Sequence, residues 1–259
     1  MGNIYKSAEG QAAIVAWYDK QLAQARLNTR IIQTTYGDTH IIEVGNAANP
    51  ALILLPGTNF SAWSWRDYFA SLSTYFHVIA VDPIGQPGKS GSNRLPFKGT
   101  GYGEWLVSVL NALQKDDVFV IGHSLGGWLA LKLAAFARER VAKIVLVDPA
   151  GIVPLSINAR VMVKSLPFML MPGERSSRGL LELMSLHPPT IQNVEWMTLV
   201  SRHVNSSLAP PPVPSVELQN IKADILLHDN VTLQVCSPPT RFAIYRRLLE
   251  AAQRVSAWV

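Results

Sequence analysis

Short apolar runs alternate with longer stretches in which apolar residues recur at helical spacing. The apolar runs are typical of strands buried on both faces and comprise Ala51–Leu55, Val78–Val81, Asp117–Ile121 and Lys143–Val147. The helical stretches that follow or separate them are Ser61–Tyr75, Tyr102–Gln114 and Leu125–Arg140. This alternation predicts an α/β fold with a doubly wound, mostly parallel sheet and helices on both of its faces.

Two further elements are predicted before this core. Gln11–Leu27 carries apolar residues at helical spacing and predicts a leading helix. Arg30–Tyr36 and His40–Val44 flank Gly37-Asp38, a dipeptide typical of tight turns, so we expect a β-hairpin here.

The pattern changes between Ile152 and about Pro214. This segment is rich in Met, Pro and Ser and contains helical stretches, so we interpret 152–214 as a cap inserted over the sheet. The strand and helix pattern returns at Ala223–Leu227 and Thr240–Val255. We therefore expect one domain spanning residues 1–259 with a cap insertion.

The cap segment contains large apolar residues with two possible uses. They could line a site for an apolar acyl or alkyl group, or they could be ordinary core. The residues concerned are Met162, Phe168, Met169, Met171, Met184, Trp196 and Met197.

Composition excludes several classes of protein. Hydrophobic residues make up 48% of the chain and charged residues 16%, which excludes a disordered chain. The net charge of +5 is modest and spread out, so we expect no nucleic-acid partner. We see no signal-peptide pattern and no apolar run long enough to cross a membrane. The single cysteine, Cys236, excludes an internal disulfide framework and fits a reducing compartment, so we expect a cytoplasmic protein of undetermined oligomeric state.

The strongest chemical signal is the run Gly122-His123-Ser124-Leu125-Gly126 between a predicted strand and a predicted helix. A G-x-S-x-G sequence in that position is typical of a sharp turn that lifts a serine hydroxyl above the edge of a sheet. The glycines leave room for the turn, and the following backbone N–H can bind an oxyanion. This arrangement predicts Ser124 as a nucleophile.

Three further stretches accompany this motif at characteristic spacing. They are Leu54-Leu55-Pro56-Gly57-Thr58, Ala80–Ser90 and Val145–Gly151. The second of these stretches contains a glycine-containing loop that begins with Asp82. With them, the chain resembles the α/β-hydrolase superfamily from about residue 30 to 255, and more narrowly its cap-bearing, esterase-like members. In the first stretch, Pro56 stands where that family usually has histidine.

The resemblance implies a serine esterase that acts on small or medium acyl groups through an acyl-enzyme intermediate. The backbone N–H groups of Thr58 and Leu125 would form its oxyanion hole. The family's acid lies just past the strand that follows the cap, and Asp229 is the best match. No metal or other cofactor is implied, and the expected partner is a small-molecule ester.

The general base does not follow directly from the family pattern. The family order is serine, acid, then histidine, but none of the histidines follows Asp229. We therefore expect the family's last strand and histidine loop to be absent, and we assign His228 as the candidate base.

Three interpretations remain open. The chain could be a truncated or frame-altered hydrolase. It could use a rearranged triad, with Asp148 as acid and His228 or His203 as base. It could also be a pseudo-hydrolase that binds a ligand or partner under the cap without turnover.

Two other features have simpler explanations. Gly85–Ser90 resembles a phosphate-binding loop, but Pro83 occupies the position of the required first glycine. His123 is a neighbour of Ser124 on a tight turn and points elsewhere, so we expect it to fill space.

Overall fold

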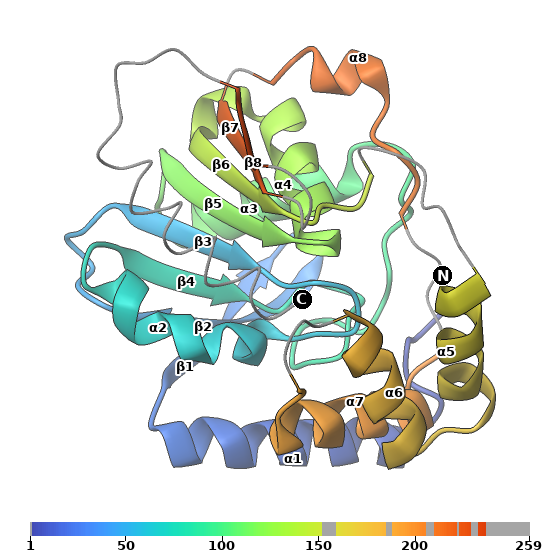
Figure 1. The fold of residues 1–259 in the computed structure, drawn as a ribbon. Coiled ribbons are helices and arrows are strands. Elements are labelled where there is room, and N and C mark those ends of the chain that lie inside the picture. The colour runs from blue at the N-terminus through green and yellow to red at the C-terminus, as the bar shows by residue number, and fades with distance from the viewer. Residues whose placement is uncertain are drawn as a thin grey trace.

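A computed structural model describes residues 2–151, 159–184, 188–205, 210–221, 223–228 and 233–236. Its centre is an eight-stranded sheet in the order β1-β2-β4-β3-β5-β6-β7-β8 (Figure 1). The strands are β1 (Asn28–Thr34), β2 (Gly37–Val44), β3 (Ala51–Leu55), β4 (His77–Val81), β5 (Val118–His123), β6 (Val141–Val147), β7 (Asp224–His228) and β8 (Leu233–Cys236). Strands β4, β3, β5, β6 and β7 are parallel to one another, which confirms the predicted mostly parallel α/β sheet.

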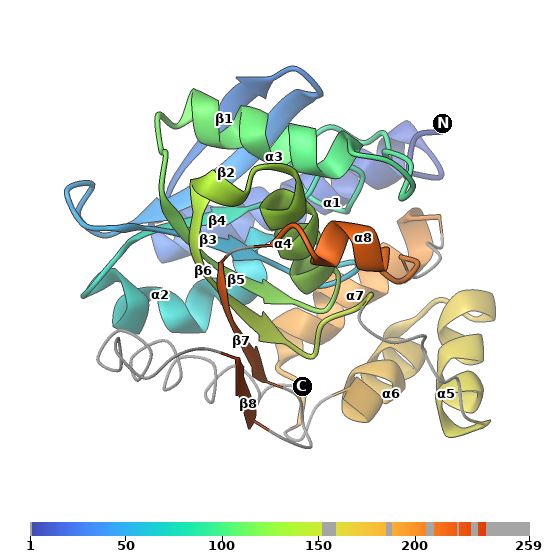
Figure 2. The ribbon, with the colours of Figure 1, turned by 90° about the horizontal axis from the view of Figure 1, so that it is seen from above.

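Helices cover both faces of this sheet. The α-helices are α1 (Ala8–Ala25), α2 (Arg66–Ser73), α3 (Gly101–Ala112), α4 (Leu125–Phe136), α5 (Ala159–Leu170), α6 (Glu174–Met184), α7 (Ile191–His203) and α8 (Ser215–Leu218). Two 3₁₀ turns, η1 (Ala62–Trp65) and η2 (Arg138–Arg140), complete the described elements. Figure 2 shows α3 and α4 on one side of the sheet and α2 on the other.

Alternate residues of the central strands pack into two separate cores. Leu52 and Leu54 of β3 belong to the core that also contains side chains of α1, α2 and α7. Ile53 and Leu55 belong to the core formed with α3 and α4. Because both faces are covered, β3 is buried along its whole length, and this explains its continuous apolar sequence.

The hairpin forms where it was predicted, but its turn is displaced. Thr34 pairs with Gly37, so the connecting residues are Thr35 and Tyr36 rather than Gly37-Asp38. Gly37 adopts a φ of 103° and begins β2. Glycine tolerates this left-handed conformation, which explains its use at the start of the returning strand.

The segment between β6 and β7 supplies α5, α6 and α7, which lie together in Figures 1 and 2, with α7 packed against α1. In Figure 1 the arrowheads of β3, β4 and β5 point toward the side on which these helices lie. Within the described ranges, no helix is both long and apolar enough to span a membrane.

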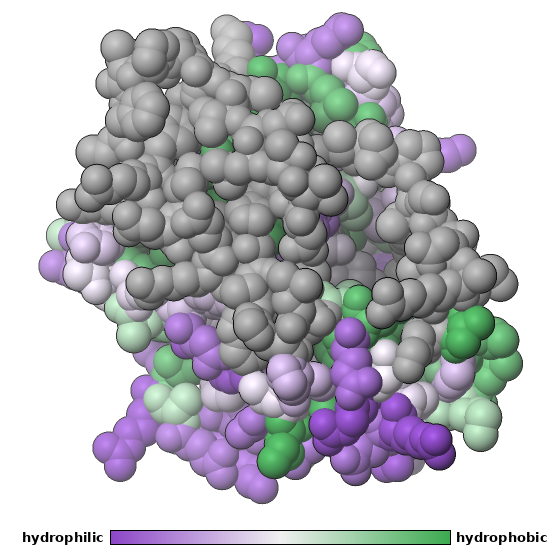
Figure 3. All heavy atoms as spheres, in the orientation of Figure 1, coloured by the Kyte–Doolittle hydropathy of each residue, from purple (hydrophilic) through white to green (hydrophobic). Residues whose placement is uncertain are grey.

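The large apolar residues of this segment divide into buried and exposed groups. Trp196 and Met197 are buried in the core, as the ordinary-core interpretation predicted. Met169 and Met171 instead remain largely exposed, and Figure 3 shows apolar surface over α5. The side chain of Met162 lies outside the described residues.

Strand β8 was not expected from the sequence. It pairs antiparallel with β7, with His228 opposite Leu233. The predicted helix Thr240–Val255 and the expected absence of a histidine loop both fall outside the described residues.

Candidate active site

Ser124 lies in a strained turn between β5 and α4. Its φ of 50° and ψ of −113° lie outside the usual regions for a residue other than glycine. The Ser124 amide donates to the Val147 carbonyl at 2.9 Å, and the Ser124 carbonyl accepts from the Ala150 amide at 3.0 Å. Backbone groups at the end of β6 and just after it therefore hold this turn in place.

The two glycines of the motif are required by close backbone packing. A Cβ on Gly122 would lie 2.3 Å from the carbonyl oxygen of Gly126. A Cβ on Gly126 would lie 1.9 Å from the carbonyl oxygen of Leu55 in β3. Neither contact is possible for a real side chain, so the predicted spatial reason for glycine at these positions is confirmed.

A second turn, at the end of β3, lies beside Ser124. A Cβ on Gly57 would lie 3.4 Å from the Cβ of Ser124. Leu125 is the first residue of α4, so its N–H has no partner within the helix. Thr58 and Ser124 retain part of their surface, whereas Gly57 and Leu125 are buried. The structure thus brings the Gly57–Thr58 turn and the start of α4 together beside the partly exposed residue Ser124.

His123 fills space between the two turns. A Cβ on Gly57 would lie 3.0 Å from its Nδ1 atom, so the imidazole packs against the Gly57 backbone. Desolvation by the surrounding protein lowers the pKa of His123 to about 4. The imidazole is therefore neutral near pH 7, which supports the predicted space-filling role.

The strand register aligns the ends of β5, β6 and β7. His123 pairs with Val147, and Val147 pairs with His228. The residues that follow these positions, Ser124 and Asp148, consequently leave neighbouring strands at the same level of the sheet. Asp148 has a φ of 42°, so the chain turns sharply there too.

The structure describes the remaining candidate acid and bases to different extents. Asp229 lies outside the described residues, and the side chain of His228 is likewise not described. His203 ends α7, and a Cβ on Gly10 would lie 2.9 Å from its Nδ1 atom. His203 therefore packs against α1.

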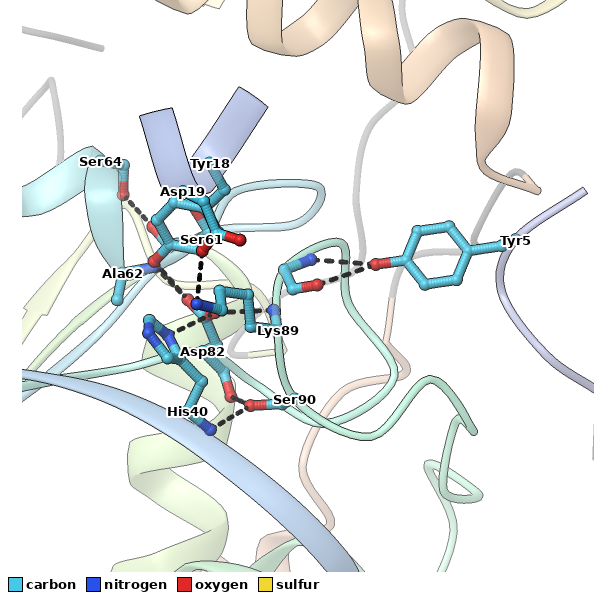
Figure 4. A network of polar contacts seen from close by, with 11 residues as sticks. Tyr5, Tyr18, Asp19, His40, Ser61, Ala62, Ser64, Asp82, Lys89 and Ser90 are labelled. Atoms are coloured by element: carbon cyan, nitrogen blue, oxygen red, sulfur yellow. Dashed lines mark hydrogen bonds and ion pairs between the residues drawn. The ribbon is translucent and has the colours of Figure 1, made fainter. Parts of the chain in front are cut away.

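A buried polar network around Asp82 was not foreseen from the sequence (Figure 4). Asp82 Oδ2 lies 2.9 Å from His40 Nδ1, and Oδ1 accepts from the Tyr18 hydroxyl at 3.0 Å. The Ala62 amide also donates to Oδ1, at 2.7 Å, and the Lys89 amide donates to Oδ2 at 3.0 Å. Asp82 therefore ties α1 and β2 to the residues that follow the Gly57–Thr58 turn.

Asn59, in that turn, is also held by side chains from distant parts of the chain. Its amide donates to Gln86 Oε1 at 2.9 Å, and its carbonyl accepts from Trp196 Nε1 at 2.8 Å. Sequence patterns assigned Trp196 only to core or cap and did not single out Asn59 or Gln86.

No group of three or more His, Cys, Asp or Glu side chains gathers as metal ligands in the part of the chain that the structure describes. At this location the Ser124 turn lies beside the start of α4 and the Gly57–Thr58 turn.

Known proteins with similar sequences include carboxylesterases. The chain is 33% identical over 135 residues to carboxylesterase YbfK of Bacillus subtilis (strain 168), an alignment that covers 51% of this chain and 46% of YbfK. It is 34% identical over 125 residues to an uncharacterized carboxylesterase, nap, of the same organism, which covers 48% of this chain and 42% of that relative. The aligned part thus spans less than half the length of either relative.

A solved structure and a family model extend the similarity. The naproxen esterase (carboxylesterase NP) from Bacillus subtilis superimposes with a TM-score of 0.74 at 25% identity, covering 86% of this chain and 81% of that chain. The sequence model of the alpha/beta hydrolase family matches residues 52–257, a range that contains the Ser124 turn and every parallel strand except the first residue of β3. The chain therefore belongs to the alpha/beta hydrolase family.

Proposed function

We propose that this protein hydrolyses carboxylic esters of small or medium acyl groups, with Ser124 as the nucleophile. The observation that carries the proposal is the strained Ser124 turn, which sets a partly exposed hydroxyl beside the N-terminus of α4 and the Gly57–Thr58 turn. Backbone strain of this kind persists only where the surrounding structure maintains it, and it is concentrated at functional sites. The carboxylesterase relatives support the same class of substrate.

In the proposed reaction, the Ser124 hydroxyl attacks the ester carbonyl and loses its proton to a histidine base. The N–H groups of Thr58 and Leu125 donate hydrogen bonds to the oxyanion of the tetrahedral intermediate. Collapse of that intermediate expels the alcohol and leaves an acyl group on Ser124. Water activated by the same base then releases the acid and restores the hydroxyl.

We assign His228 as the base and Asp229 as the acid, with Asp148 as the alternative acid. The register of β5, β6 and β7 supports this choice, because Ser124 and Asp148 follow neighbouring strand ends and His228 pairs with Val147. We also propose that residues 152–214 act as a cap over the strand ends. The Trp196–Asn59 hydrogen bond supports contact between this segment and the site. A cytoplasmic location and a small-molecule ester as partner stay predictions.

The first test is hydrolysis of 4-nitrophenyl butyrate by the wild-type chain and by Ser124→Ala, followed over many turnovers. Loss of the nucleophile from a serine triad costs on the order of 10⁶ in kcat. We expect sustained release of nitrophenol by the wild type and none above background by the variant. Equal rates for the two proteins would overturn the proposal.

The base and acid are tested in the same assay. His228→Ala should abolish sustained turnover, and Asp229→Asn and Asp148→Asn should separate the two candidate acids by the size of their losses. His203→Ala is the matched control, because His203 packs against Gly10 of α1. Full activity of His228→Ala would exclude His228 as the base.

One observation favours a second function, ligand binding without turnover. None of the six histidines of this sequence occurs after Asp229. In that case the wild type should release at most one equivalent of nitrophenol, and Ser124→Ala should still bind butyrate esters.

A further inference from the structure

We propose that Trp196 and Gln86 position the oxyanion-binding amide of Thr58 by holding Asn59 from two sides. The inference rests on the function proposed above, because it takes the Thr58 N–H as an oxyanion donor. Trp196 and Gln86 contact Asn59, not the reacting atoms, and are therefore positioning residues.

The turn after β3 contains three consecutive peptide groups, and each is held by a hydrogen bond. The Phe60 amide donates to the Gly57 carbonyl at 3.1 Å, which fixes the peptide between Gly57 and Thr58. In a trans peptide the C=O and the N–H point in opposite directions. Fixing the Gly57 carbonyl inside the turn consequently aims the Thr58 N–H out of it.

The other two peptide groups of this turn belong to Asn59. Gln86 Oε1 accepts from the Asn59 N–H, and this contact fixes the peptide between Thr58 and Asn59. Trp196 Nε1 donates to the Asn59 carbonyl, and this contact fixes the next peptide. Asn59 has a φ of 67°, which a type II turn requires at its third residue. A flip of the central peptide to the commoner type I geometry would break the Gln86 contact.

Trp196 is itself held firmly. It is 3% exposed, and its ring lies 5.3 Å from that of Trp17 and 5.8 Å from that of Tyr18 on α1. The Tyr18 hydroxyl donates to Asp82, whose Oδ1 also accepts from the Ala62 amide after the turn. Trp196 therefore joins α1 and the Asp82 network to the turn.

The position of α7 thus affects the turn that contains Thr58. Trp196 lies in the segment between β6 and β7, whereas Thr58 follows β3, so the two are remote in sequence. We infer that the segment proposed as the cap contributes to the rate of the reaction, in addition to any contact that it makes with substrate.

The test compares Trp196→Phe with Trp17→Phe. Each substitution keeps an aromatic ring in the same cluster and removes one indole N–H, but the Trp17 N–H donates to Glu195 at the surface. We expect Trp196→Phe to lower kcat about tenfold with KM within about twofold, since a small misplacement of a catalytic group can cost up to about 10² in rate. Trp17→Phe should keep nearly the wild-type kcat.

A second variant and a second readout guard against general damage to the fold. Gln86→Met removes the acceptor for the Asn59 N–H and should also lower kcat rather than raise KM. Affinity for n-butylboronic acid, which mimics the tetrahedral intermediate, should fall in both variants by about the same factor as kcat. Because both residues act on one turn, the double variant should lose less than the product of the single losses.

The outcomes separate this inference from the proposed function. If Ser124→Ala is inactive but Trp196→Phe and Trp17→Phe behave alike, the positioning role is wrong and the esterase assignment stands. If Trp196→Phe and Gln86→Met change only KM, the two residues affect binding and the inference also fails. If Ser124→Ala is as active as the wild type, the proposed function itself fails.

Discussion

The Ser124 turn and the Gly57–Thr58 turn meet at one point but are built by different means. Backbone contacts hold the first: its amide and carbonyl bond to the end of β6, and glycines at 122 and 126 allow the surrounding strands and helix to approach. Side chains from distant elements hold the second, namely Gln86 and Trp196 at Asn59.

The difference determines what a sequence can reveal. A turn that depends on backbone approach needs glycine at fixed offsets, so it leaves a local motif. A turn held by remote side chains leaves no local signal for those side chains, because they are separated from it along the chain and any residue with a suitable donor or acceptor could serve. The two turns should therefore respond differently to substitution.

The largest expected effect is that of Gly126→Ala in the Ser124 turn. The new Cβ would lie 1.9 Å from the Leu55 carbonyl oxygen, so β3 or α4 must shift. Overpacking of this kind costs about 3 kcal/mol or more of unfolding free energy when backbone has to move. We expect lost esterase activity together with a lower urea midpoint for unfolding.

Gly91→Ala is the matched control for that substitution. Its added Cβ would meet Ile84 at 3.5 Å, which is ordinary van der Waals contact. A Gly126→Ala protein as stable and active as Gly91→Ala would contradict the account of the Ser124 turn as a product of close backbone approach.

A smaller effect is expected from His123, which supports both turns. Its pKa is about 4 in the folded protein and about 6.5 when unfolded, so the unfolded state binds the proton more readily. This contribution is fully present above pH 6.5 and is lost as the pH falls from 6.5 to 4. Over that range the wild type should lose at most about 3 kcal/mol more unfolding free energy than His123→Gln.

Urea unfolding at pH 7 and at pH 4 measures this difference. Equal losses in the two proteins would mean that the surrounding protein does not lower the pKa of His123. We also expect that His123 does not set any pH dependence of activity near pH 6, because its pKa is about 4.

Much of the fold could be predicted from local pattern. The strands β3, β4, β5 and β6 are continuous apolar runs because they are covered on both faces. The helical spacing of apolar residues in α3 matches the face that it buries, whereas α4 is apolar and buried along nearly its whole length. The hairpin turn was misplaced because Gly37 serves as the first residue of β2 rather than as part of the connection. β8 was missed because the run Leu233–Cys236 is short and mixed in polarity.

The candidate site was predictable only in part. Ser124 and its glycines follow from the motif, and the space-filling role of His123 follows from the tightness of the turn. Asp82 could be recognised as the start of a glycine-containing loop, but not as the common acceptor for Tyr18 and the Ala62 amide, because those residues meet only through tertiary packing. For the same reason, the contact between Trp196 and Asn59 could not be predicted from the sequence.

The smallest expected effect concerns the conformation of Asn59 itself. Its φ of 67° is tolerated by asparagine and glycine but strains alanine by about 1 kcal/mol. Asn59→Ala should therefore lower Tm by about 2–4 °C, whereas Asn59→Gly should differ less from the wild type. Both variants keep the amide and carbonyl that contact Gln86 and Trp196, so kcat should fall much less than in Trp196→Phe. If Asn59→Ala instead lowered kcat as much as Trp196→Phe at a similar Tm, the asparagine side chain, and not the hydrogen bonds to its backbone, would set the position of the turn.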